Sequence, residues 1–241
     1  MNTGALATPV PVQKIPHGPL PGLLLVLTMV TGMVDAISYL KLGHVFVANM
    51  TGNIAFLGFA VADAQEFSIA ASLTATIAFL VGALAGGRLG TGLGIHRGRF
   101  LVFSIFIETA IVGAALCAWI LPDEPDGDSL RYVLIVLLAL AMGLQNATAR
   151  RIGVPDLTTT VLTQTLTGLA ADSTLVGGKN PRPIRRLAAT FTMFLGAAIG
   201  TFVIFHFNLG TVLALISMLL LGSGIAALRY FTSTDPWTEG D

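Results

Sequence analysis

Charged side chains are scarce in this chain of 241 residues: only 11% are charged, against roughly 25% in an ordinary globular domain. Apolar residues make up 54% of the chain, and the mean hydropathy is +0.81. This composition excludes an ordinary soluble domain and indicates a membrane protein. The 13 basic and 13 acidic residues balance, and no basic block is long enough to indicate binding of nucleic acid.

Cysteine is nearly absent, since Cys117 is the only one, and an internal disulfide is therefore excluded. No two histidines or carboxylates stand at metal-ligand spacing on one predicted helix, so neither a metal site nor another cofactor is predicted. No secretory signal is visible, because the first hydrophobic segment is long enough to be a span. Residues 1–19 contain four prolines and no apolar core and are expected to be a disordered cytosolic tail.

Long apolar runs account for much of the chain. Each approaches or reaches the ~20 residues that a helix needs to cross a hydrocarbon core of ~30 Å. The runs are 21–40, 69–87, 100–121, 132–144, 187–207 and 209–228. Two further segments, 45–62 and 157–177, are apolar in part but carry many polar side chains; the second has seven threonines. If both segments cross, the protein has eight spans, and if both enter and return on one side, it has six.

The distribution of basic residues separates these two topologies, because Lys and Arg gather on the cytoplasmic side. With eight spans the two sides carry seven and six basic residues, which is no bias. With six spans one side carries eleven and the other only Lys41 and Arg131. We therefore predict an all-α membrane protein with six transmembrane helices, two re-entrant or broken half-helix segments and both termini in the cytoplasm. Eight full spans remain the alternative.

The two halves of the chain resemble each other. The stretch GMVDA (32–36) is similar to GLQNA (143–147), and FLVGALAG (79–86) is similar to MFLGAAIG (193–200). The offsets are 111 and 114 residues, and a polar segment lies between the two matches in each half. Three crossings in each copy would make the second copy upside down relative to the first, which is an inverted repeat of the kind found in transporters. Each copy also contains a Gly-x-x-x-Gly motif that favours close helix packing, either between the copies or at equivalent places elsewhere.

This repeat predicts the domain organisation. After the tail, the expected parts are a first membrane repeat (20–121), an acidic external loop (122–130), a second membrane repeat (131–230) and a cytosolic tail (231–241).

The polar segments are the first candidates for a functional site. Asn49, Thr51 and Asn53 can cap a half-helix that begins inside the membrane, and the positive end of that helix would then face the midplane. In the second copy, Thr160, Thr163 and Gln164 are the candidates for the same role from the opposite side. We expect these side chains to bind a solute or an ion.

Charged and amide groups within the spans are the other candidates. Asp35 lies well inside the first span, where a carboxylate costs roughly 2.5–3.5 kcal/mol, and is a candidate proton or cation site. A protonated or hydrogen-bonded Asp35 that only holds the helices together is the alternative. Glu108 is a second buried carboxyl candidate, and Asn146 stands where the repeat places the counterpart of Asp35. Gln145 beside it is interpreted as a packing residue.

The stretch GMVDAISYLKLGHVFVANMTGNIAFLG (32–58) resembles the YoaK-like family of bacterial inner-membrane proteins, and GLQNATARRIGVPDLTTTVLTQTLTGL (143–169) is similar to a second signature of that family. The resemblance extends over nearly the whole chain. It implies a multi-pass protein of the bacterial inner membrane and supplies neither a substrate nor a reaction.

The leading functional hypothesis is a small-solute transporter or channel with a polar site near the midplane. The alternatives are a non-transporting assembly or sensory protein and an intramembrane enzyme. The chain has no Gly-x-Ser-x-Gly and no His-Glu-x-x-His motif, so catalytic residues are not predicted. The expected partners are the lipid bilayer and an unidentified small solute, and a homo-oligomer is left open.

Overall fold

The computed structural model describes residues 17–64, 66–93, 96–121, 127–157, 162–179 and 182–239. Its main elements are helices, in chain order α1 (Leu20–Lys41), α2 (Met50–Val61), α3 (Ile69–Gly92), α4 (Arg97–Ile120), α5 (Asp128–Ile152), α6 (Leu162–Ala171), α7 (Pro183–His206) and α8 (Leu209–Leu228). Two short 3₁₀ turns, Thr174–Val176 and Pro236–Thr238, complete them.

Six of these helices, α1, α3, α4, α5, α7 and α8, have 20 to 25 residues and are apolar enough to cross a membrane. At 1.5 Å per residue they are roughly 30–38 Å long, which matches a hydrocarbon core of ~30 Å. By contrast, α2 has 12 residues and α6 has 10, so these two helices are too short to cross. The prediction of an all-α membrane protein with six long helices is confirmed.

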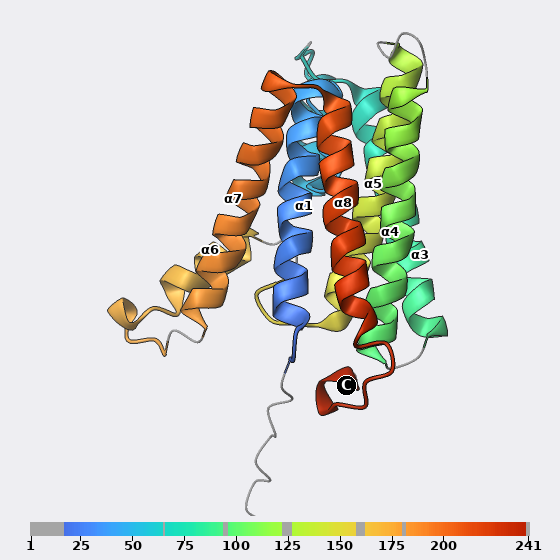
Figure 1. Cartoon of the computed structure of the whole chain (residues 1–241). Coiled ribbons are helices and arrows are strands. Elements are labelled where there is room, and N and C mark those ends of the chain that lie inside the picture. The colour runs from blue at the N-terminus through green and yellow to red at the C-terminus, as the bar shows by residue number, and fades with distance from the viewer. Residues whose placement is uncertain are drawn as a thin grey trace, which may run out of the picture.

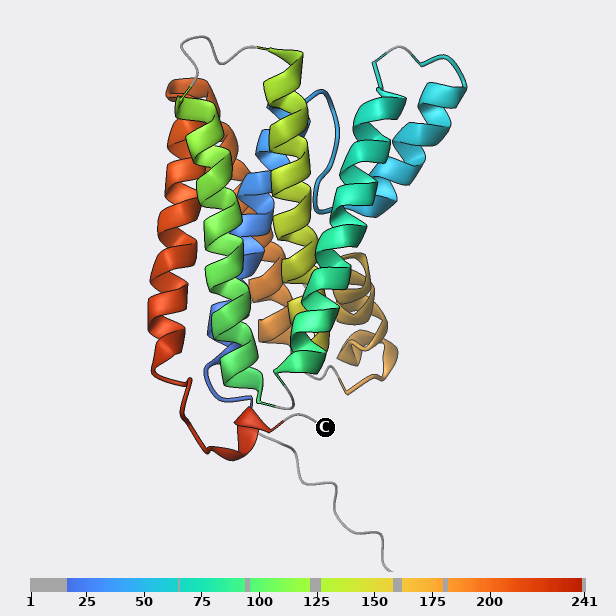
Figure 2. The same cartoon turned by 90° about the vertical axis from the view of Figure 1, so that its right-hand side faces the viewer.

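The long helices run side by side in one bundle (Figure 1). We call the end at which α1 begins and α8 ends the lower end, as the figure draws it, and the other the upper end. From the top of α1 the chain descends to the middle of the bundle, and α2 then climbs back to the upper end (Figure 2). Helix α6 lies in the lower half (Figure 1). The two short helices therefore belong to opposite ends, as the re-entrant topology requires.

Helix α5 is longer than the apolar run that predicted it. It begins at Asp128, within the predicted external loop, and continues past the apolar run to Ile152. Gly153 ends it with a φ of +66°, a conformation that glycine adopts without strain. The polar stretch around Asn146 is therefore the last part of a spanning helix. Residues 122–126 of the predicted loop lie outside the described residues.

The C-terminal segment, predicted as a tail, packs back on the lower end of the bundle. Trp237 is buried and lies against Gly18, just before α1. His96, at the start of α4, makes a 2.9 Å hydrogen bond to the backbone carbonyl of Ser233. Of the predicted N-terminal tail, only residues 17–19 are among those described.

Glycines set the closest helix contacts. A Cβ added to Gly82 of α3 would lie closer than 3.0 Å to the Leu140 carbonyl oxygen of α5, and one added to Gly143 of α5 would be as close to Phe79 of α3. The same relation joins α7 to α1: Gly196 meets Met29, and Gly32 meets Met193. The two Gly-x-x-x-Gly motifs therefore do not pack on each other. Each packs on a helix of the other half of the chain.

Candidate functional site

A cavity of about 380 Å³ opens where α1 and α7 meet the first turns of α2 and α6. We call it the Asp35 cavity. Its polar lining brings together four predicted site residues from three separate parts of the chain, along with Thr31; the lining residues are Thr31, Asp35, Ala48, Asn49, Thr51, Gly52, Ala55, Leu162, Thr163 and Met193. The sequence alone indicated each of these residues separately, and only the fold shows that they line one cavity.

Two asparagine side chains stabilise the backbone where the chain turns into α2. Asn49 is the N-cap residue of this helix, and its side chain accepts a 3.4 Å hydrogen bond from the Gly52 amide. Asn53, one turn into the helix, is fully buried and binds the backbone of Phe46 at both groups: its oxygen accepts from the Phe46 N–H at 2.9 Å, and its nitrogen donates to the Phe46 carbonyl at 2.5 Å. Asn53 therefore satisfies a loop backbone that would otherwise be unpaired at membrane depth. It does not line the cavity.

Aromatic rings pack around the same loop. Phe46 stacks on Tyr39 and on Phe56, with ring centroids 5.4 and 5.6 Å apart. Phe56 also stacks on Phe67, at 4.7 Å. These contacts join the loop to α1, to α2 and to the connection before α3, so aromatic packing supports the first half-helix.

Asp35 is the single charged group among the described lining residues. It is 9% exposed, and its Oδ1 atom is buried without a hydrogen-bond partner in the part of the chain that the structure describes. The backbone of Ala48, in the loop before α2, faces this carboxyl group. Thr31, one turn earlier on α1, donates to the Leu27 carbonyl at 3.0 Å. The carboxyl group therefore has unused capacity to accept a hydrogen bond or to hold a cation.

Gln145 was interpreted as packing, but it connects the two halves of the protein. Its nitrogen donates to the Thr31 hydroxyl at 2.7 Å and reaches the Leu27 carbonyl at 3.3 Å. The side chain is 1% exposed and joins α5 to α1 beside the cavity. An amide within a span was the available signal, because polar side chains at that depth usually face the interior of the bundle and pair there.

A buried arginine holds the second half-helix in place. Arg186, in the first turn of α7, forms ion pairs with Asp156 at 3.0 Å and with Asp172 at 2.8 Å, and it also donates to the Gly168 carbonyl. Asp156 precedes α6 and Asp172 follows it, so one guanidinium clamps both ends of the segment. The second half-helix is thus held by charge, whereas the first is held by Asn53 and aromatic packing.

Three of the predicted site residues lie away from the cavity, and a fourth falls outside the described residues. Glu108 is buried in α4, and Asn146 donates to the Met142 carbonyl within its own helix at 2.8 Å. Gln164 is exposed on α6. Neither α4 nor α5 lines the Asp35 cavity. Thr160 falls within 158–161 and lies outside the described residues.

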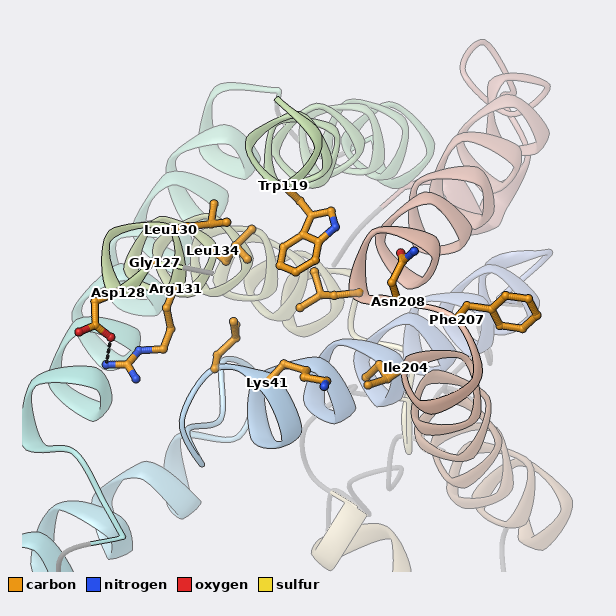
Figure 3. A pocket seen from close by; sticks show the side chains of 12 residues that line it. Lys41, Trp119, Gly127, Asp128, Leu130, Arg131, Leu134, Ile204, Phe207 and Asn208 are labelled. Carbon is orange, nitrogen blue, oxygen red and sulfur yellow. Dashed lines mark ion pairs between the residues drawn. The ribbon is translucent and has the colours of Figure 1, made fainter. Parts of the chain in front are cut away.

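A second cavity, of about 340 Å³, lies at the upper end, and no residue was predicted for it. Lys41, Trp119 and Asn208 surround it, and Arg131 pairs with Asp128 at one side, with 3.2 Å between nitrogen and oxygen (Figure 3). Asn208 is engaged as the cap of α8 and accepts from the Thr211 amide at 2.9 Å. Over the described ranges, no group of three or more histidines, cysteines or carboxylates is placed to hold a metal ion.

Comparison with known proteins agrees with this architecture. Residues 23–226 match the family described as "Protein of unknown function (DUF1275)". The chain is 35% identical over 152 residues to "UPF0700 transmembrane protein YoaK" of Bacillus subtilis (strain 168), a match that covers 62% of this chain and 65% of the Bacillus protein. The matched part is thus slightly less than two thirds of that relative. No solved structure matches. The chain is therefore a YoaK-like multi-pass membrane protein and belongs to the DUF1275 family.

Proposed function

We propose that this protein is a small-solute transporter or channel and that the Asp35 cavity is its solute site. One observation carries the proposal: two half-helices that come from opposite ends of the bundle both begin at one cavity, next to a buried carboxyl group. Broken helices of this kind surround solute sites in transporters, because their free backbone groups and partial charges can bind a ligand at membrane depth.

An inverted repeat supports the proposal. The contact glycines are related by the same two offsets as the sequence matches. Gly32 and Gly143 are 111 positions apart, and Gly82 and Gly196 are 114 positions apart. Their backbone partners, Met193 and Phe79 for one pair and Met29 and Leu140 for the other, follow the same offsets. We infer two copies of one unit, each made of a span, a half-helix and two further spans. Relative motion of two such copies around a fixed site is the usual basis of alternating access.

Asp35 is assigned the coupling role within this proposal. A carboxyl group that lines a cavity within a span, and whose buried oxygen has no described partner, can bind a proton or a cation. Asp35→Asn keeps the shape of the side chain and removes only the charge. Once a substrate is known, flux through this variant in vesicles should no longer respond to pH or to the coupling ion. A variant that folds and keeps the wild-type response would remove Asp35 from the mechanism.

Ligand binding gives a direct test before any flux assay. A solute present at 100 times its Kd should stabilise the purified protein by about 2.7 kcal/mol, or roughly 5–11 °C in Tm for a chain of this size. Thr163→Ala removes one hydrogen bond to the solute and should weaken binding roughly two- to tenfold. Thr167→Ala is the matched control, because Thr167 lies on the same helix and does not line the cavity. Equal binding by both variants would exclude Thr163 from the site.

We propose the bacterial inner membrane as the location, with the lower end in the cytoplasm. The support is the gathering of eleven basic residues on one side of a six-span chain, with Lys41 and Arg131 on the other. Single cysteines should be placed at positions 126 and 175 in a Cys117→Ala background and labelled in intact cells with an impermeant thiol reagent. Leu175 is 94% exposed beyond α6, at the lower end. Position 126 should label and position 175 should not; the opposite pattern would refute the orientation.

An assembly or sensory role is the second candidate function. It is favoured by the purely structural contacts of Asn53 and Arg186. Both are polar groups of the half-helices that stabilise backbone or ion pairs and do not line the cavity. Solute flux into reconstituted vesicles separates the two functions, since an assembly protein would carry none. We propose transport in preference to catalysis, because the described lining of the Asp35 cavity supplies one carboxyl group and neither histidine nor cysteine beside it.

A further inference from the structure

An apolar groove runs along one side of the bundle, away from the Asp35 cavity. Helices α3 and α4 both pack along α5 but touch each other at few positions, so a gap is left between them. The gap has a volume of about 520 Å³. Its lining is apolar except for one cation; the lining residues are Gly82, Ala85, Arg88, Leu89, Gly92, Leu93, Ile107, Ile111, Leu140 and Leu144.

The groove covers half of the membrane thickness. On α3 it extends from Gly82 to Leu93, at the lower end of the helix. Eleven residues at 1.5 Å each give about 16 Å, close to half of a hydrocarbon core of ~30 Å. Leu140 and Leu144 of α5 lie roughly 18 and 12 Å above the lower end of their helix by the same rise. The two lining residues of α4 lie roughly 15 and 21 Å above the lower end of that helix. The groove therefore extends from the lower end to about the midplane and faces mainly the lower leaflet, where the surrounding phase consists of acyl chains.

Arg88 stands one turn before the end of α3, in the lower part of the groove, with Gly92 and Leu93 below it. Its side chain is exposed, and its guanidinium forms no ion pair with a carboxylate of the described ranges. A long basic side chain near the end of a span extends to the headgroup layer. The groove thus combines an apolar trough as long as one leaflet with an unpaired positive charge at headgroup depth.

This charge is not a consequence of the repeat. The offset of 114 that relates Gly82 to Gly196 places Phe202 of α7 at the position equivalent to Arg88. Phe202 is 56% exposed and cannot attract an anion. The charge of Arg88 therefore belongs to the α3–α4–α5 groove alone, because the position related to it by the repeat, in α7, is uncharged.

We propose that this groove binds one anionic phospholipid, with an acyl chain between α3 and α4 and the headgroup phosphate on Arg88. Basic pockets between transmembrane helices on the cytoplasmic side bind anionic headgroups. One basic side chain near the headgroups contributes about 1 kcal/mol, which corresponds to about fivefold in affinity. The proposal is independent of transport, because none of the groove residues lines the Asp35 cavity.

Native mass spectrometry of the full chain in mild detergent tests this site. Phosphatidylglycerol and phosphatidylcholine with identical acyl chains are titrated in parallel, and the Kd of the first bound lipid is measured for each. The wild type should prefer phosphatidylglycerol by about fivefold. Arg88→Gln should bind the two lipids equally. Arg150→Gln, which removes a charge at the lower end of α5 outside the groove, should keep the preference.

A steric pair tests the trough itself. Ala85 lines the groove and is exposed, so Ala85→Phe fills it without disturbing the core and should weaken the binding of both lipids at least fivefold. Leu84→Phe is the control, because Leu84 is 73% exposed on the same helix and lies outside the groove. The proposal is overturned if Ala85→Phe behaves like Leu84→Phe, or if Arg88→Gln keeps the preference or loses no more of it than Arg150→Gln.

Discussion

Replacing the contact glycines by alanine should destabilise the protein at two helix pairs, α3 with α5 and α7 with α1. The added Cβ at Gly82 or Gly196 would lie closer than 3.0 Å to a backbone carbonyl oxygen, whereas ordinary contact begins at 3.4 Å. The helices would have to separate by at least about 0.4 Å along a close-packed interface, and overpacking of this kind costs about 1–3 kcal/mol. A backbone oxygen cannot rotate away as the end of a side chain can.

Gly113→Ala supplies the baseline. Gly113 lies in the middle of α4 with no atom within 4 Å of its added Cβ, so alanine there should gain up to about 1 kcal/mol from helix propensity. The same gain applies to the contact glycines, so the contact and control variants should differ by the overpacking cost alone, about 1–3 kcal/mol, or roughly 2–12 °C in Tm. Gly90→Ala should fall between them, because it meets the movable Arg151 side chain.

The assay is thermal unfolding of purified variants in one detergent, with folded yield measured alongside. The Tm values of Gly82→Ala and Gly196→Ala should fall together below that of the wild type, since the proposed repeat gives the two glycines the same position in the two halves. If both variants have the same Tm as Gly113→Ala, the close approach of α3 to α5 and of α7 to α1 is wrong. If only one falls, the two interfaces are not equivalent, and the support for an inverted repeat is lost.

Two further predictions concern the half-helices. Asn53→Ala leaves both the N–H and the carbonyl of Phe46 unpaired and should cost about 2–5 kcal/mol, whereas Asn49→Ala removes a single long cap bond and should cost about 1 kcal/mol; comparable Tm losses for the two would contradict the assigned contacts. Arg186→Gln removes two ion pairs from the ends of α6 and should speed hydrogen exchange in 162–171 while leaving exchange in 50–61 unchanged; Arg185→Gln, which makes no described ion pair, is the control, and equal exchange in both variants would refute the clamp.

Much of the architecture could be predicted from the sequence, because the membrane imposes strong one-dimensional rules. A spanning helix needs a long apolar run, and basic residues prefer one side, so the run lengths and the positions of the 13 basic residues were enough to predict six spans and two half-helices. The polar run that contains Asn49 indicated a helix start inside the membrane for the same reason, since backbone groups there must find partners. Helix ends were less well predicted: α5 extends beyond its apolar run at both ends, and charged residues such as Asp128 and Arg150 are exposed there, since a helix can continue past the hydrocarbon core where polar side chains meet headgroups and water.

Contacts between the helices were decided by the tertiary structure alone. Asp35 and Thr163 are separated by 128 positions, and only the rotation of each helix about its axis brings them to one cavity while Glu108 and Asn146 point elsewhere. The link from Gln145 to Thr31 and the clamp around Arg186 have the same origin. Hydropathy specifies that a segment lies in the membrane, but in a chain this apolar it does not specify which face meets which neighbour. Close packing does, through the few positions where glycine lets two backbones touch.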